Sequence, residues 1–185
     1  FKGKLAITNS TNESYIAGTT VYMQAAGVDR SKDWLEGMKA NVGTRVYNKH
    51  GKIVADVASG RKQLGLVNHY YIYRHLAKHP NAPITMVVPD QGEKGMGVAW
   101  NVSGVALSKH SKRKQAALRF IEFLVSKEGQ KIFAEVNREY PTREGVPASA
   151  EVPPLQSFKV ADVPMYELGI KRNETIDLIE RVGMP

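Results

Sequence analysis

Short apolar runs alternate along this chain with longer stretches of helical periodicity, and this alternation limits the fold more than any other feature. Residues 4–8 (KLAIT), 64–67 (LGLV) and 84–88 (ITMVV) are runs of this kind, each followed by asparagine or proline. Such runs are typical of buried strands. Because strands separated by helices usually pair in parallel, the sequence predicts an α/β fold with a largely parallel sheet covered by helices.

The helical stretches have clear limits. The capping-type residues at 9–12 (NSTN) predict a helix that runs to about Ala26 and ends at Gly27. A proline-rich, irregular stretch is expected over 141–164. Further helices are expected over 31–42, 53–58, 70–78, 111–125, 128–140 and 173–182, with one more strand-like segment over 98–107.

The composition removes several classes of protein. No cysteine is present, so disulfides, zinc ribbons, thiol nucleophiles and iron–sulfur clusters are excluded, and any metal must be held by oxygen or nitrogen. No apolar stretch approaches the roughly 18–20 residues that cross a bilayer. The chain begins with Phe1 and not with methionine, so the lack of a leader says nothing about its compartment.

The net charge of +8 would suit nucleic acid, an acidic membrane surface or a small anionic ligand. The positive residues are dispersed along the chain, apart from the run from Lys109 to Lys114, which we interpret as the solvated start of a helix. The tyrosines of residues 70–74 could in principle stack on single-stranded nucleic acid. Basic residues are not gathered beside them, so we expect no nucleic-acid partner.

The densest group of functional side chains lies at 68–75 (NHYYIYRH), directly after the run 64–67 and at an expected helix start. Open α/β sheets bind ligands at the carboxyl ends of their strands, and a bend there would let Tyr70 and Tyr71 reach one ligand. Tyrosine ordinarily loses its proton near pH ~10, so coordination at neutral pH needs a strongly Lewis-acidic ion such as Fe(III). The alternative is that the two rings only pack.

Two histidines, His75 and His79, have the i, i+4 spacing that can chelate zinc or copper. No acidic residue accompanies them, and Lys78 lies between them. We therefore interpret this turn as a solvent-facing helix end, where positive charge is favourable. His50 and His110 stand alone in polar contexts and are interpreted, from the residues alone, as surface side chains.

Enzymatic motifs are absent from the sequence. It contains no G-x-S-x-G elbow, Walker loop, dinucleotide-binding glycine motif or H-E-x-x-H. Ser10, Thr11 and Asn12 follow the first apolar run, where hydroxyls and helix N–H groups can hold an anion, although capping alone also explains them. A binding protein is therefore favoured over an enzyme.

Several motifs together resemble the periplasmic ferric-ion-binding proteins, the substrate-binding components of bacterial iron ABC transporters. They are FKGKLA at 1–6, DVASG at 56–60, GLVNHYY at 65–71, NVSG at 101–104, FIEFL at 120–124 and REYP at 138–141. The resemblance runs through nearly the whole chain. It implies two lobes of the type II periplasmic-binding fold that close over Fe(III), which is then handed to an inner-membrane ABC permease.

The resemblance also implies a set of iron ligands. Tyr70 and Tyr71 match the paired phenolate ligands, and Asn68 matches a residue that supports the site or its synergistic anion. Tyr15 lies about one residue from the place where some members carry a third tyrosine. Whether the third oxygen comes from Tyr15 or from an exogenous anion is left open.

An anion such as carbonate or phosphate would be held, by the same resemblance, at the start of the first helix. Ser10, Thr11 and Asn12 match the loop that binds the anion in some members. His50 stands where some relatives have an anion-binding asparagine. These residues are the expected anion-binding or supporting set.

The chain is shorter than members of this family and resembles their C-terminal part, without most of the first lobe. The resemblance places 1–96 and 147–185 in the second lobe, while 97–146 cross back to the first. The helices of 111–136 would then expose an apolar face, so we expect an oligomer or a domain swap. The expected partners are the missing N-terminal lobe and the permease, and the expected location is the periplasm.

A second hypothesis keeps the fold and changes the ligand. The protein would then be a periplasmic receptor for a small organic or inorganic anion, such as a phosphonate or sulfate. Arg45, Ser10 and Thr11 would supply the contacts.

Overall fold

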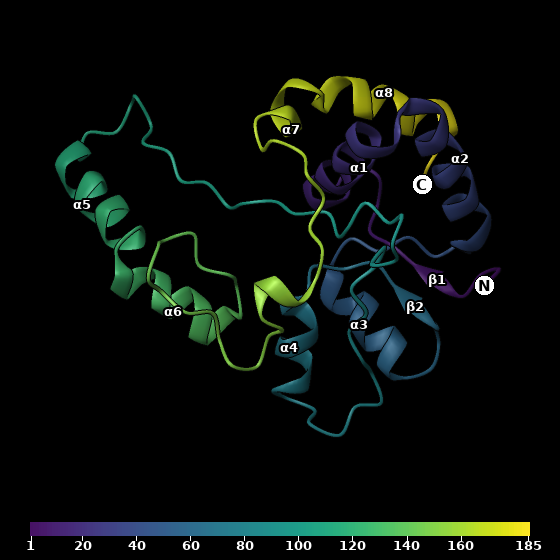
Figure 1. Cartoon of the computed structure of the whole chain (residues 1–185), viewed down its shortest axis with the longest axis horizontal. Coiled ribbons are helices and arrows are strands. Elements are labelled where there is room, and N and C mark those ends of the chain that lie inside the picture. Colours follow the sequence, from purple (N-terminus) through teal and green to yellow (C-terminus); the bar gives the residue numbers. More distant parts are fainter. The chain divides into compact units, whose positions relative to one another are not determined.

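The computed structural model describes all residues of the chain, 1–185, which form two compact units (Figure 1). Unit 1 comprises Phe1–Asn101 and Phe158–Pro185, and unit 2 comprises Val102–Ser157. The lobe boundaries expected from the resemblance, at 96/97 and 146/147, differ somewhat from these limits. The assignment of segments to lobes stays a prediction.

Most helices of unit 1 begin and end where the sequence predicts. Gly27, with a φ of 87°, closes α1 and leads directly into α2. Asn12 caps the start of α1, because its side-chain oxygen accepts from the backbone N–H groups of Ser14 and Tyr15. The helices are α1 (Glu13–Ala26), α2 (Val28–Asn41), α3 (His50–Ala58), α4 (Tyr70–Leu76), α7 (Glu167–Ile170) and α8 (Arg172–Val182).

The sheet is much smaller than expected. Strands β1 (Leu5–Ala6) and β2 (Leu64–Gly65) pair in parallel, and two isolated parallel bridges join Thr8 to Tyr47 and Val98 to Val160. The parallel pairing of the first two predicted strands is therefore confirmed. The strands predicted over 84–88 and 98–107 are wrong: apart from the single bridge at Val98, these segments join no ladder. Apolar periodicity indicates a half-buried strand only where a partner completes the hydrogen bonds.

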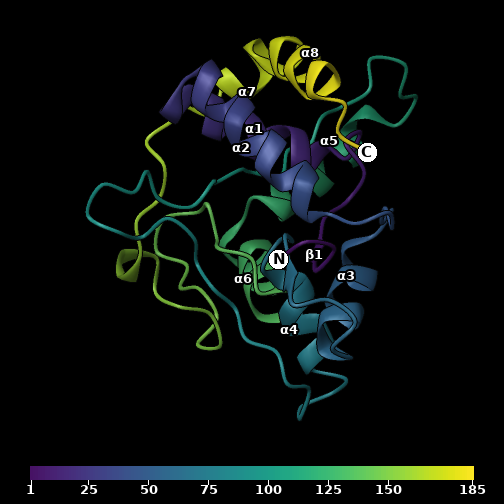
Figure 2. The ribbon, with the colours of Figure 1, turned by 90° about the vertical axis from the view of Figure 1, so that its right-hand side faces the viewer.

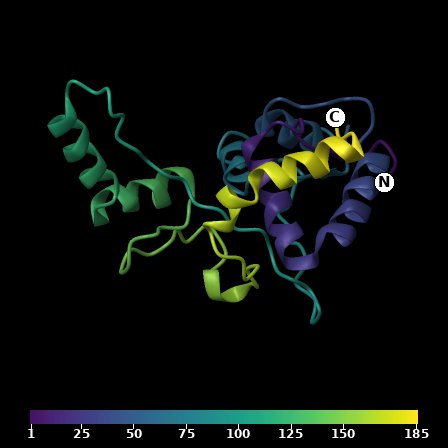
Figure 3. The same ribbon diagram turned by 90° about the horizontal axis from the view of Figure 1, so that it is seen from above.

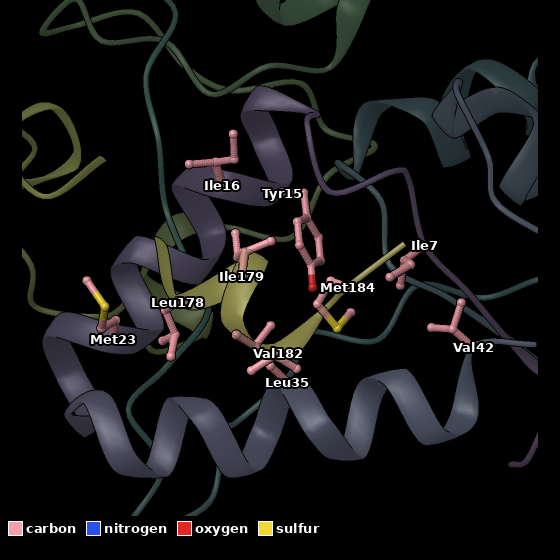
Figure 4. Packing of buried hydrophobic residues seen from close by; sticks show 10 residues of the cluster. All are labelled: Ile7, Tyr15, Ile16, Met23, Leu35, Val42, Leu178, Ile179, Val182 and Met184. Atoms are coloured by element: carbon pink, nitrogen blue, oxygen red, sulfur yellow. The ribbon is translucent and has the colours of Figure 1, made fainter. Parts of the chain in front are cut away.

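Helices α1, α2 and α8 lie against one another and enclose the main core of unit 1 (Figures 2 and 3). The hydroxyls of Thr20 and Thr175 form a buried hydrogen bond of 2.9 Å that joins α1 to α8. The core residues are Ile7, Tyr15, Ile16, Met23, Leu35, Val42, Leu178, Ile179, Val182 and Met184 (Figure 4).

Close packing between α3 and β2 fixes where the chain enters α4. A Cβ atom on Gly65 would lie 2.5 Å from the Cγ2 atom of Ile53, so only glycine fits at this point of β2. Ile53 is fully buried with Ala6 and Tyr47 in a second small core. As a result, the segment after β2 leads from a tightly held strand into α4.

Unit 2 consists of α5 (Lys114–Leu124), α6 (Lys127–Asn137), the short 3-10 helix η1 (Leu155–Ser157) and irregular segments. Both long helices were predicted and are confirmed. Ser126 caps α6 by accepting from the Gly129 N–H at 3.1 Å. The apolar side chains of the two helices are largely exposed; they include Leu118, Phe120, Phe123, Ile132, Phe133 and Val136.

None of the helices, in either unit, combines the length and the apolar character needed to cross a bilayer.

Candidate functional site

Tyr70 and Tyr71 begin α4, and four residues separate this helix from the end of β2. Their ring centroids are 4.6 Å apart with an angle of 40° between the planes, so the two rings lie side by side. Both side chains are half-buried, whereas the core tyrosines Tyr15 and Tyr47 are only 5% and 2% exposed. The tyrosine pair therefore combines close approach with access to solvent, as a shared ligand requires.

Asn68 connects this pair to the first turn of α1. Its Nδ2 atom donates to the Tyr70 hydroxyl oxygen at 2.8 Å and to the Ser14 hydroxyl oxygen at 3.2 Å. A donor aimed at a phenol oxygen stabilises negative charge on that oxygen. Asn68 thus lies where the resemblance places a supporting residue, although its interaction with an anion stays a prediction.

Arg74 covers both tyrosines from the next turn of α4. Its guanidinium carbon is 5.3 Å from the ring centroid of Tyr70 and 5.4 Å from that of Tyr71. These distances are typical of cation–π contacts. The sequence spacing alone could have predicted this contact, because residue 74 follows Tyr70 by four positions and Tyr71 by three on one helix. Arg74 was not among the site residues expected from the sequence.

His50 flanks the pair on the other side. It begins α3 and stacks on Tyr71, with ring centroids 4.9 Å apart and planes at 17°. The residue is 7% exposed, and neither ring nitrogen has a hydrogen-bond partner. Burial lowers the pKa of His50 below its usual value. The expectation of a plain surface histidine is therefore wrong, because the aromatic stack and α3 enclose the ring.

The loop at 9–12 is occupied mainly by local contacts. The Asn12 side chain is used in capping α1, and the Thr11 hydroxyl donates to the Asn9 side-chain oxygen at 3.1 Å. The Ser10 N–H donates to the carbonyl oxygen of Pro185 at 2.7 Å. The capping interpretation of Asn12 is confirmed, and an anion-binding role for Ser10, Thr11 and Asn12 stays a prediction.

Tyr15 lies in the apolar core of unit 1 and not with the tyrosine pair. Its hydroxyl is buried without a hydrogen-bond partner, and Figure 4 shows the oxygen beside Met184. Burial raises the pKa of this hydroxyl well above its usual value. The expected role of Tyr15 as a metal ligand does not fit this position, because the side chain is buried among apolar core residues.

A polar cavity of about 220 Å³ lies beside the loop at 9–12. Arg45 and Lys52 bring positive charge to it; the full lining is Asn9, Arg45, Val46, Tyr47, Asn48 and Lys52.

Asp56 is almost fully buried and is bonded to two residues that line this cavity, Tyr47 and Arg45. It accepts from the Tyr47 hydroxyl at 2.6 Å and forms ion pairs with Arg45 and Arg61. The Tyr47 hydrogen bond, with the two guanidinium groups, lowers the pKa of Asp56. Burial and the nearby carboxylate raise the pKa of Tyr47 to about 12.

Comparison with known proteins identifies similar chains. Residues 1–159 match the family model of the bacterial extracellular solute-binding proteins. Iron uptake protein A1 of Synechocystis is 31% identical over 175 residues, which cover 91% of this chain and 48% of that protein. The chain spans about half the length of the curated relatives it matches.

Solved structures show the same fold. A ferric binding protein from Campylobacter jejuni superposes with a TM-score of 0.84 at 26% identity, covering 100% of this chain and 60% of that one. A Trichodesmium protein (IdiA, FutA) solved with iron and citrate gives a TM-score of 0.76 at 29% identity, with the same coverage. The predicted fold class, that of type II periplasmic binding proteins, is confirmed. With this fold and with the family model matching most of its length, the chain belongs to the bacterial extracellular solute-binding proteins.

Proposed function

We propose that this chain forms one side of a ferric-ion site, in which Tyr70 and Tyr71 donate phenolate oxygens to the same ion. The observation that carries the proposal is the side-by-side placement of the two rings at the start of α4, 4.6 Å apart and open to solvent. The similarity to proteins named for iron uptake and ferric binding supports this choice of ion.

The surroundings of the pair suit a trivalent cation bound through phenolates. Each phenol must lose its proton, and a highly charged ion at the oxygen makes this possible at neutral pH. Asn68 donates a hydrogen bond to the Tyr70 oxygen, and Arg74 places positive charge over both rings. These contacts offset the negative charge that two neighbouring phenolates would bring together.

The pair would occupy only part of the coordination sphere of the ion. We propose that an exogenous anion, such as carbonate, phosphate or citrate, and groups of the missing first lobe fill the remaining positions. Tyr15 is left out of the ligand set because of its place in the core. His50, Asn68 and the 10–12 loop are the proposed supporting residues for the anion.

In the whole protein, we propose, this site is the cargo site of a periplasmic substrate-binding protein that delivers iron to an inner-membrane ABC permease. An ion held by groups from both lobes would favour the closed form, because both sets of contacts exist only there. The chain alone should therefore bind iron more weakly than the two-lobed protein.

Titration with ferric citrate tests the proposal through visible absorption. Bound iron should produce a phenolate-to-iron charge-transfer band, and Tyr70→Phe and Tyr71→Phe should each reduce it strongly. Tyr166→Phe is the matched control, because Tyr166 is 65% exposed and belongs to neither the pair nor the core. A colourless protein at saturating ferric citrate, or a band that survives in the Tyr70→Phe/Tyr71→Phe double variant, contradicts the proposal.

A second candidate is a receptor for a small anion on the same fold. The polar cavity beside the 9–12 loop favours it, because Arg45 and Lys52 line this cavity with two asparagines. Calorimetry with phosphate, sulfate or a phosphonate in the absence of iron separates the two candidates. Iron-independent binding that is lost in Arg45→Gln would favour the anion receptor.

A further inference from the structure

His75 lies in the last turn of α4, and His79 follows the end of this helix by three residues. Helical hydrogen bonding continues past Leu76 into the turn that follows, because the N–H of His79 donates to the carbonyl oxygen of His75 at 2.9 Å. The N–H of Ala77 likewise donates to Tyr73 at 2.9 Å. Both histidines are therefore held on one face of the same helical turn.

The two imidazole rings are in contact. Their centroids are 4.7 Å apart, and the planes meet at 40°. His79 is exposed and His75 is half-buried, so the pair is open to solutes on one side. The rings occupy the arrangement that the i, i+4 spacing permits but does not by itself require.

This arrangement suits a cation with nitrogen ligands. Metal–imidazole bonds are about 2.0–2.1 Å long, so two nitrogens bound to one ion lie only about 3 Å apart. Rings whose centroids are 4.7 Å apart reach that separation by small side-chain rotations. We propose that His75 and His79 form a chelating site for a divalent ion of borderline softness, with Cu²⁺ bound more tightly than Zn²⁺ or Ni²⁺.

The site differs in chemistry from the tyrosine pair on the same helix. Imidazole nitrogen suits Cu²⁺, Zn²⁺ and Ni²⁺, whereas hard Fe(III) prefers anionic oxygen. Helix α4 would thus carry an oxygen site at its start and a nitrogen site at its end. The carbonyl groups at the helix end favour a cation there, while Lys78 opposes it through like charge.

The rest of the coordination sphere must come from solvent or from an added ligand. The structure contains no group of three or more histidine, aspartate or glutamate side chains that could hold a metal ion. Two protein ligands leave positions open for water or chloride. We therefore expect binding that is weaker than at a closed structural site, with rapid exchange.

The exposure of Lys78 and His79 agrees with the sequence interpretation of this turn as a solvent-facing helix end, and the proposal adds a ligand to it. Spacing alone left the orientation of the two side chains open, and the missing acidic residue made a metal site less favoured. The observed ring contact supplies the geometric observation that the sequence lacked.

Calorimetry and electron paramagnetic resonance with Cu²⁺ test the proposal on the tag-free chain. We expect one Cu²⁺ bound per chain, with a spectrum that reports two nitrogen donors. His75→Ala and His79→Ala should each weaken binding by at least about 10- to 100-fold, because this is the loss that follows when only an outer-shell partner of a metal ligand is removed. His110→Ala is the control, since His110 lies in unit 2 and has no histidine neighbour in the structure.

Two further arms separate this site from the ferric site. The double variant His75→Ala/His79→Ala should keep the ferric charge-transfer band, and Tyr70→Phe/Tyr71→Phe should keep Cu²⁺ binding. His79→Gln guards against a general effect of shortening the side chain, because glutamine is polar and of similar length but has no imidazole. Unchanged Cu²⁺ affinity in His79→Gln, or a spectrum with fewer than two nitrogens, overturns the proposal.

Discussion

Replacing Tyr15 by phenylalanine tests whether Tyr15 is a core residue or an iron ligand. The Tyr15 side chain is 5% exposed, and its hydroxyl has no hydrogen-bond partner. The Thr19 hydroxyl donates to the Tyr15 carbonyl oxygen at 2.8 Å, so the phenol oxygen of Tyr15 stays without a hydrogen bond. Tyr15→Phe removes this oxygen and keeps the ring that packs in the core cluster with Ile179 and Met184 (Figure 4).

The magnitude follows from the cost of a buried polar group without a partner. Such a group costs about 1–3 kcal/mol, so its removal should raise the free energy of unfolding by about 1 kcal/mol after packing adjusts. For a chain of this size, that corresponds to a rise of roughly 2–4 °C in the melting temperature. Tyr15→Ala should instead lower the free energy of unfolding by about 3–5 kcal/mol, because it removes the ring and leaves a cavity.

Urea denaturation followed by circular dichroism measures the stability, and ferric citrate titration measures the charge-transfer band of the same variants. We expect Tyr15→Phe to be at least as stable as the parent and to keep its full iron band. A loss of more than about 1 kcal/mol would show that the hydroxyl has a favourable partner. Loss of the iron band in a stable Tyr15→Phe variant would show that Tyr15 reaches the metal, and would refute the placement of Tyr15 as a core residue only.

Three further predictions concern charge and exposed surface. Asp56→Asn should lower the free energy of unfolding by about 1–3 kcal/mol at neutral pH. Since the pKa of Asp56 is lowered in the folded state, its contribution is present above the unfolded pKa of about 4 and lost as pH falls below it. Urea titrations from pH 7 to 3 should therefore show a shallower loss in this variant than in the parent, and equal slopes would contradict the assignment. Arg74→Met should shift the ferric charge-transfer band to longer wavelength, because less positive charge faces the phenolates, and Arg74→Lys should restore part of the shift; an unchanged band position in Arg74→Met would argue against an electrostatic role. The exposed apolar face of α5 and α6 should drive association that Phe120→Ser and Val136→Ser reduce, and light scattering that shows a monomer at all concentrations would contradict this.

The helices of this chain could be predicted well because their signals are local. Gly27 ends α1 and Asn12 begins it, each through contacts within a few residues. The apolar spacing of 111–125 likewise predicted α5, although no residue of α5 is buried. In the following helix, α6, only Gly129 and Ala134 are buried. Periodicity reports which face a helix would bury, even where the structure leaves that face uncovered.

Strands were predicted less well, since a strand depends on a partner elsewhere in the chain. Residues 4–8 and 64–67 contain β1 and β2 because each supplies the ladder of the other. The equally apolar run 84–88 stays irregular, and its Val87 is 75% exposed. Nothing in the run itself distinguishes these outcomes.

By itself, the sequence determined the order of helices, the absence of thiol chemistry and the adjacency of Tyr70 and Tyr71, because these depend on residue identity and short-range spacing. Only the tertiary structure decided which tyrosines meet solvent, since Tyr15 is buried by α8, more than 150 residues along the chain. The tertiary structure also decided the burial of His50, which the sequence predicts to be a surface residue but which is stacked on Tyr71 and only 7% exposed. The burial of a side chain depends on segments that are distant in sequence, so it cannot be read from the residues next to it in the chain.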